Sequence, residues 1–170
     1  MADVHFAAER WEKAEGIYLR AARTAPPTET AAWSDMQRAR CLAQLGKLSK
    51  ALDVYSRFRT EHRRSVWADD ALLRAGVLCA GPMGDPPKAA RFFREILADY
   101  PDGDQAETAF LYLATLAWWG GEWAEAERLN KAFLEKYPGS PFREEILTVR
   151  LPAIARKSPV SGTAAREAKK

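Results

Sequence analysis

Four segments of the chain fall into register when they are aligned on one alanine column. The alanines are Ala14, Ala51, Ala89 and Ala126, so successive segments lie 37, 38 and 37 residues apart. An apolar residue stands three and seven positions after each alanine, a glycine stands five before three of them, and a proline stands twelve after three of them. A period of about 20–50 residues indicates one supersecondary unit stacked on itself.

These columns predict a helix that begins after a glycine turn and ends before a proline. The apolar positions share one face at the helical period, and alanine lets a neighbouring helix cross closely. Proline stops the helix because it has no N–H donor and its ring clashes with the preceding turn. Arg63 stands in the proline column, so we expect a looser turn there.

A second helix precedes the alanine helix in each repeat. Residues 31–44, 68–78 and 105–119 carry apolar side chains at helical spacing and contain no proline. Each of these ranges holds a small residue, namely Ala39, Gly76 or Ala114. Because no segment alternates like a strand, the sequence predicts an all-α chain of tandem helix–turn–helix units.

The two ends differ from the middle. Apolar residues keep a 3–4 spacing from Val4 to Ala21, which predicts one long helix over residues 3–24, ended by Pro26 and Pro27. The last helix, about 141–150, is expected to stop or kink at Pro152 and to cap the stack. Residues 157–170 are expected to be a disordered basic tail, either a solubilising end or a weak contact to an acidic surface. The expected segments are 1–27, 28–64, 65–102, 103–139, 140–156 and 157–170.

Composition narrows the classes of function. The formal net charge is +3, from 26 Lys+Arg against 23 Asp+Glu in 170 residues. This balance disfavours an acidic disordered chain and a strongly electrostatic nucleic-acid protein. No apolar run is long enough to span a membrane, and the chain as written starts without an export signal, which favours the cytoplasm.

The residue types that carry chemistry are sparse. The two histidines, His5 and His62, lie far apart, and no zinc, acyl-transfer or phosphate-binding motif occurs. We therefore expect no catalytic residue, metal or cofactor. Cys41 and Cys79 are interpreted as buried thiols, with a disulfide conceivable only if their Cα atoms lie within about 7 Å. A basic cluster is interpreted as a solvated helix end, with nucleic-acid binding the less favoured alternative; it comprises Arg57, Arg59, His62, Arg63 and Arg64.

These residues resemble the tetratricopeptide repeat. The resemblance rests on Gly121, Trp123 and Ala126 in Gly-x-Trp-x-x-Ala, on the small residues of the first helices and on the proline column. The lengthened period with Tyr-Pro ends, as at Tyr137-Pro138, resembles a bacterial subtype that includes the outer-membrane assembly lipoprotein and the Tol–Pal-associated periplasmic coordinator. The resemblance implies a right-handed α-solenoid and, through the subtype, a cell-envelope location if Met1 is not the natural start. Glu9, Arg63, Pro86 and Asn130 depart from the pattern.

The resemblance also implies a binding surface, because the first helices of this family line a concave groove. Transferred by position, the first repeat contributes Trp33, Met36, Gln37, Arg40 and Gln44. The second contributes Asp70, Leu73, Arg74 and Val77, and the third contributes Thr108, Leu111, Tyr112, Thr115, Trp118 and Trp119. The alternative for any of these residues is packing between helices. The family's clamp for chaperone carboxylates is not expected, because the corresponding positions lack its Lys and Asn.

The sequence therefore predicts a non-enzymatic scaffold that binds a peptide or amphipathic helix of another protein in an aromatic groove. Two alternatives stay open. The first is a structural module that forms homo-oligomers through its N-terminal helix. The second is a nucleic-acid binder that uses the basic cluster and the tail.

Overall fold

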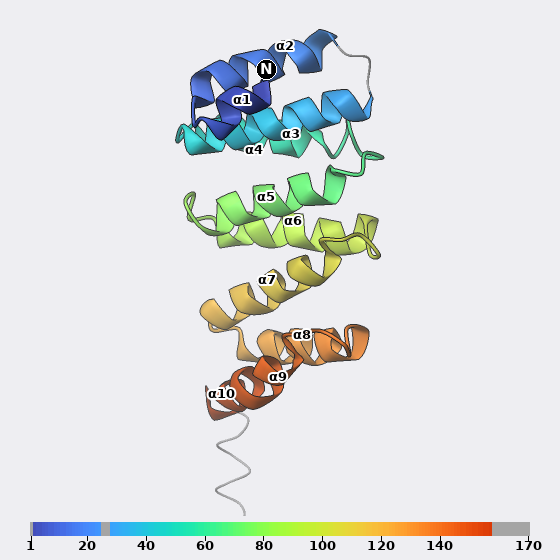
Figure 1. Ribbon diagram of the computed structural model, residues 1–170. Coiled ribbons are helices and arrows are strands. Elements are labelled where there is room, and N and C mark those ends of the chain that lie inside the picture. The colour runs from blue at the N-terminus through green and yellow to red at the C-terminus, as the bar shows by residue number, and fades with distance from the viewer. Residues whose placement is uncertain (1, 25–27, 158–170) are drawn as a thin grey trace, which may run out of the picture. The chain divides into compact units, whose positions relative to one another are not determined.

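The computed structural model describes residues 2–24 and 28–157 of the chain (Figure 1). Within those two ranges all regular secondary structure is helical and no strand is present. The chain divides into two compact units, residues 1–106 and 107–170. The predicted fold class, all-α with tandem helix–turn–helix units, is confirmed. The expected helix stop at Pro26 and Pro27 and the expected tail lie outside the described residues, apart from Lys157.

Six helices make up the described part of the first unit. Each packs against the next along the chain, so that α1 to α6 lie side by side in chain order (Figure 1). Their bounds are α1 Ala2–Ala7, α2 Trp11–Thr24, α3 Glu29–Gln44, α4 Leu48–Arg57, α5 Ala68–Ala80 and α6 Pro86–Asp99.

The alanine column lies at the centre of the helix packing. Ala14, Ala51 and Ala89 are each 0% exposed, and so is Ala126 in the second unit. The bulky residues four positions later in the first unit, Tyr18, Tyr55 and Phe93, are buried as well. A methyl group at the crossing lets the helices approach until these large rings fill the remaining space.

The second unit contains α7 Ala106–Trp119, which begins at the unit boundary, and α8 Trp123–Lys136. A final helical segment then runs through α9 Arg143–Glu145, the π-helix Ile146–Arg150 and α10 Leu151–Lys157. α10 packs against α8, and its Ile154 is fully buried.

Of the two outcomes expected at Pro152, a stop or a kink, the stop does not occur, because α10 continues to Lys157. The Leu151 N–H bonds to the carbonyl of Ile146, five residues back, so the chain forms a wider π turn just before the proline. A π turn shifts the hydrogen-bonding pattern, and the helix then continues past a residue that has no N–H.

The prediction of one uninterrupted helix over residues 3–24 is wrong. The chain turns between α1 and α2, and Glu9 adopts a left-handed conformation with φ 56°. Gly46, Gly84 and Gly121, in the same repeat column, have φ values of 69°, 63° and 75°. The turn is therefore conserved among the repeats although glycine is absent, and the 3–4 apolar spacing continues across it without a visible break.

The proline column explains where the alanine helices end. α6 and α8 both end just before a Tyr-Pro pair, whereas α4 ends at Arg57, about one turn earlier in its repeat. The chain that follows α4 is bonded to the next repeat, since the hydroxyl of Tyr100 donates a 2.8 Å hydrogen bond to the carbonyl of Arg63. No helix in the described ranges has the length and apolar character needed to cross a membrane.

Candidate binding pocket

A pocket of about 390 Å³ opens on the surface of the first unit. Five helices contribute to its walls, from α1 to α5. The lining residues are Phe6, Trp11, Arg40, Ala43, Gln44, Tyr55, Asp70, Leu73, Arg74, Val77 and Leu78.

Helical spacing places the side chains of α3 and α5 in the pocket. On α3, Ala43 and Gln44 lie three and four residues after Arg40. On α5, Leu73 and Arg74 lie three and four residues after Asp70, and Val77 follows three residues after Arg74. Residues at these spacings share one helix face. Two neighbouring first helices therefore present one mixed surface of apolar and charged groups.

The turn at Glu9 builds the aromatic wall of the pocket. It brings Phe6 of α1 against Trp11 of α2, with ring centroids 4.9 Å apart in an edge-to-face arrangement. Both residues pack against a core formed by Ala14, Tyr18 and Cys41. The short α1 is thus held by aromatic packing, and a hydrogen bond of 2.6 Å from the Tyr18 hydroxyl to Asp3 supports it.

The two arginines of the pocket differ in their partners. Arg74 pairs with Asp70 on the same helix at 3.0 Å. The guanidinium of Arg40 lies 4.7 Å from the centre of the Phe6 ring and donates a 2.8 Å hydrogen bond to the Gln37 side chain. Among the described residues no carboxylate forms an ion pair with Arg40. The pocket therefore offers one cation whose charge is balanced only by an aromatic face and an amide.

Tyr55 is the buried tyrosine of the pocket wall. The side chain of Tyr55 is 2% exposed, and desolvation raises the pKa of its hydroxyl well above the usual range. Arg74 and Arg40 act in the opposite direction but more weakly. Tyr55 therefore provides an uncharged aromatic surface to the pocket.

Six of the predicted groove residues come together in this pocket, namely Arg40, Gln44, Asp70, Leu73, Arg74 and Val77. Three others from α3 do not line it. Met36 and Gln37 are 1% and 4% exposed and lie in the core. Trp33 packs against Trp67 in a tilted arrangement, with ring centroids 4.7 Å apart.

The residues predicted from the third repeat lie on α7 in the second unit. Trp119 is 76% exposed, and Trp118 packs edge-to-face on Trp123 at 6.2 Å. Thr115 accepts a hydrogen bond of 3.2 Å from Arg150 and donates one to the carbonyl of Leu111. Thr108 and Tyr112 are half-buried, as is Leu111.

Sequence reasoning missed five lining residues, namely Phe6, Trp11, Ala43, Tyr55 and Leu78. The sequence analysis assigned Phe6 and Trp11 to one continuous helix. It therefore did not predict the turn that brings the two rings together. The repeat column itself held the signal, because Glu9 occupies the position of the turn glycines. A turn at that position places Phe6 and Trp11 on two different helices, whose packing can bring the two rings into contact.

The basic cluster after α4 is largely engaged by acids. Arg57 lies 3.3 Å from Asp35, Arg59 lies 2.7 Å from Glu95, and Arg63 lies 3.2 Å from Asp99. The pair with Asp35 stays within one repeat, whereas the pairs with Glu95 and Asp99 reach α6 of the next repeat. They lower the positive potential that a nucleic-acid surface would need.

Cys41 and Cys79 are free, buried thiols. Desolvation raises the pKa of Cys41 to about 11, and burial also raises the pKa of Cys79. Both thiols therefore stay protonated at neutral pH and act as small apolar groups.

Two segments of the chain match the tetratricopeptide repeat family, residues 70–103 and 108–140. They contain most of the α5–α6 pair and most of the α7–α8 pair. No curated protein matches the chain. Tetratricopeptide repeats generally mediate protein–protein interactions and are typically non-enzymatic. The fold and the two matched segments therefore define an all-helical protein whose tandem helix–turn–helix units are similar to tetratricopeptide repeats.

Proposed function

We propose that this protein is a non-enzymatic scaffold that binds a short peptide or helical segment of a partner protein in the pocket of the first unit. One observation carries the proposal. Side chains of two successive first helices meet in an open pocket of about 390 Å³ with both apolar walls and charges. That volume lies in the range of ligand pockets, and it suits a few side chains of a partner.

The chemistry of the walls favours a particular segment. Phe6, Trp11 and Leu73 offer apolar contact, whereas Arg40 has its charge balanced by no carboxylate among the described residues. A partner segment with a large apolar side chain next to an acidic one fits these walls. Its apolar side chain would contact the apolar wall, and its carboxylate would pair with Arg40. Aromatic and arginine side chains are frequent energetic centres of binding surfaces.

The N-terminal segment argues for peptide binding over self-association. Its large apolar side chains, Phe6 and Trp11, already pack within the unit. Val4 is 68% exposed but stands alone on α1. An isolated exposed valine is ordinary for a monomeric surface.

Two matched valine variants test the proposal. Val77 lies at the rim of the pocket and is 37% exposed, whereas Val66 is 74% exposed and does not line it. Peptides selected from a displayed random library on the untagged wild-type chain are titrated by fluorescence anisotropy. Val77→Asp is expected to weaken binding by about tenfold or more, because it places a charge against the apolar segment.

Val66→Asp is the control and should bind as the wild type does. Arg40→Gln should weaken those selected peptides that carry an acidic residue and leave neutral ones unchanged. Equal affinity of the wild type and Val77→Asp, with unchanged helicity by circular dichroism, would refute binding in this pocket.

A further inference from the structure

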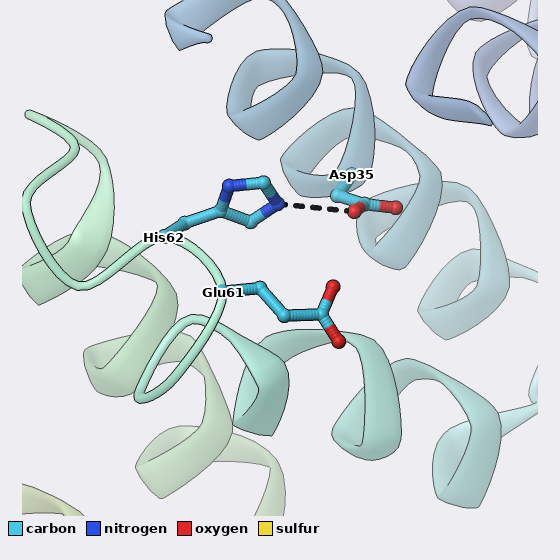
Figure 2. Close-up of side chains that lie close together, drawn as sticks. All are labelled: Asp35, Glu61 and His62. Atoms are coloured by element: carbon cyan, nitrogen blue, oxygen red, sulfur yellow. Dashed lines mark hydrogen bonds and ion pairs between the residues drawn. The ribbon is translucent and has the colours of Figure 1, made fainter. Parts of the chain in front are cut away.

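Three potential metal ligands from different parts of the first unit lie close together (Figure 2). Asp35 lies on α3, and Glu61 and His62 lie in the turns after α4. One ligand atom from each residue lies within 4.8 Å of the other two. His62 Nε2 lies 3.2 Å from Asp35 Oδ2.

The surrounding structure fixes the two inner ligands. The side chains of His62 and Asp35 are only 9% and 8% exposed. The His62 ring packs on Phe58 with centroids 4.9 Å apart, and Phe58 is itself 0% exposed. The His62 carbonyl accepts a 2.9 Å hydrogen bond from the Ser65 N–H, which holds the turn. An imidazole held at ring and backbone loses little freedom when it binds an ion.

The third ligand is free to adjust. The Glu61 backbone is held by a 2.8 Å bond from its N–H to the Arg57 carbonyl, but its side chain is 50% exposed. Zinc–ligand bonds of about 2.0–2.2 Å in a tetrahedron place ligand atoms about 3.4 Å apart. The Asp35–His62 separation of 3.2 Å is close to this spacing. Rotation of the exposed Glu61 side chain can bring its carboxylate oxygen to the same spacing from the other two ligand atoms.

We propose that Asp35, Glu61 and His62 form a binding site for one divalent transition-metal ion, best matched by Zn²⁺. One imidazole nitrogen with two carboxylate oxygens suits zinc, whereas Mg²⁺ and Ca²⁺ prefer all-oxygen ligands. Three protein ligands leave a fourth position for water. The bound ion would tie the loop after α4 to α3 at the point where the proline of the repeat pattern is missing.

An internal cation competes with the metal. Arg57 lies 3.3 Å from Asp35 Oδ1 and 3.8 Å from Glu61 Oε2. Its side chain is 42% exposed, so it can turn into solvent when the ion enters. Arg38 also approaches Asp35, at 3.9 Å, but it is paired more closely with Glu15 at 2.8 Å. Since the ion must displace Arg57 from the carboxylates, the affinity of the wild type is lower than the ligand set alone would give.

The rest of the first unit offers a clear control. The only other histidine, His5, lies on α1, outside the cluster. Both cysteines are 0% exposed, and the pKa of each thiol is raised, which disfavours the thiolate that a metal needs. Loss of binding in a His62 variant, but not in a His5 variant, therefore locates the ion.

The test uses the untagged full chain, stripped with chelator and titrated with ZnCl₂ by isothermal titration calorimetry. Wild type is expected to bind one ion, and Co²⁺ in its place should give a visible d–d absorption band. His62→Gln and Glu61→Gln should each weaken binding by about tenfold or more. His5→Gln should leave the affinity unchanged, and Arg57→Gln should tighten it by removing the competing cation.

The proposal is overturned if the wild type shows no saturable Zn²⁺ binding, or if His62→Gln and Glu61→Gln bind as the wild type does. It is also overturned if Mg²⁺ in excess displaces the zinc. Glu61→Gln is decisive where His62→Gln loses helicity, because the half-exposed Glu61 side chain is not part of the core.

Discussion

The contact between Gly76 and Phe93 permits a sharp test of how the repeats pack. A Cβ atom built on Gly76 would lie 2.7 Å from Cζ of Phe93 and nearer still to Cε1. Phe93 is 0% exposed, so its ring has no open space into which it could move. Gly76→Ala therefore forces the α5–α6 pair apart or distorts the phenyl rotamer.

The expected size follows from two opposing effects. Alanine in a helix interior is favoured over glycine by about 0.5–1 kcal/mol. Overpacking of a filled core costs about 1–3 kcal/mol. Because the clash is with a fully buried ring, we expect overpacking to outweigh the gain in helix propensity. Gly76→Ala should therefore lower the free energy of unfolding by about 1–2 kcal/mol.

Gly16 supplies the matched control. It also lies within a helix, α2, but a Cβ built there meets nothing within 4 Å. Gly16→Ala should therefore raise the free energy of unfolding by about 0.5–1 kcal/mol. The two variants carry the same chemical change, and the sign of the effect differs only through the neighbouring ring.

Urea unfolding followed by circular dichroism measures both variants. A double variant, Gly76→Ala with Phe93→Leu, should lose less stability than the sum of the single variants, because the smaller side chain relieves the clash. Stabilisation of the chain by Gly76→Ala, to the same extent as by Gly16→Ala, would refute the packing argument.

Two further predictions concern the N-terminal turn and the buried thiols. Glu9→Gly should stabilise the chain by about 1 kcal/mol in urea unfolding, because glycine adopts the positive φ of 56° without the steric cost of a side chain; an unchanged or lower midpoint would contradict the turn. Burial raises the pKa of Cys41 to about 11, above the value of about 8.5 for an unfolded thiol. Its contribution to stability is complete below the unfolded pKa and is lost as the pH rises towards 11. The urea midpoint should therefore decline over that window, and less steeply in Cys41→Ala; equal slopes would show that other groups cause the decline.

The periodic part of the fold is predictable because its causes are local. The first helices expected at 31–44, 68–78 and 105–119 correspond to α3, α5 and α7 within about two residues at each end. A helix needs only its own apolar spacing and its own start and stop residues. Where Arg63 replaces the proline, α4 ends about one turn earlier in its repeat than α6 and α8 do; the expectation of a looser turn there stays a prediction.

The candidate pocket was predictable only in part. Arg40, Gln44, Asp70, Leu73 and Arg74 follow from position in a repeat, because neighbouring first helices lie side by side. Met36 and Gln37 belong to the same positional set, yet they are buried. Position in the repeat predicts the direction in which a side chain leaves its own helix. It does not predict how completely neighbouring helices bury that side chain.

The sequence by itself determined the repeat, the all-helical class and the buried alanine column, because each depends on residues within one turn or one period of each other. Only the tertiary structure decided that Glu9 adopts the left-handed turn conformation that glycine has in the other repeats, and that Phe6 then forms a wall of the pocket. It alone also brought Asp35 of α3 beside His62, residues that no motif connects. Such pairs depend on how packed helices and their loops meet, and no local pattern carries that information.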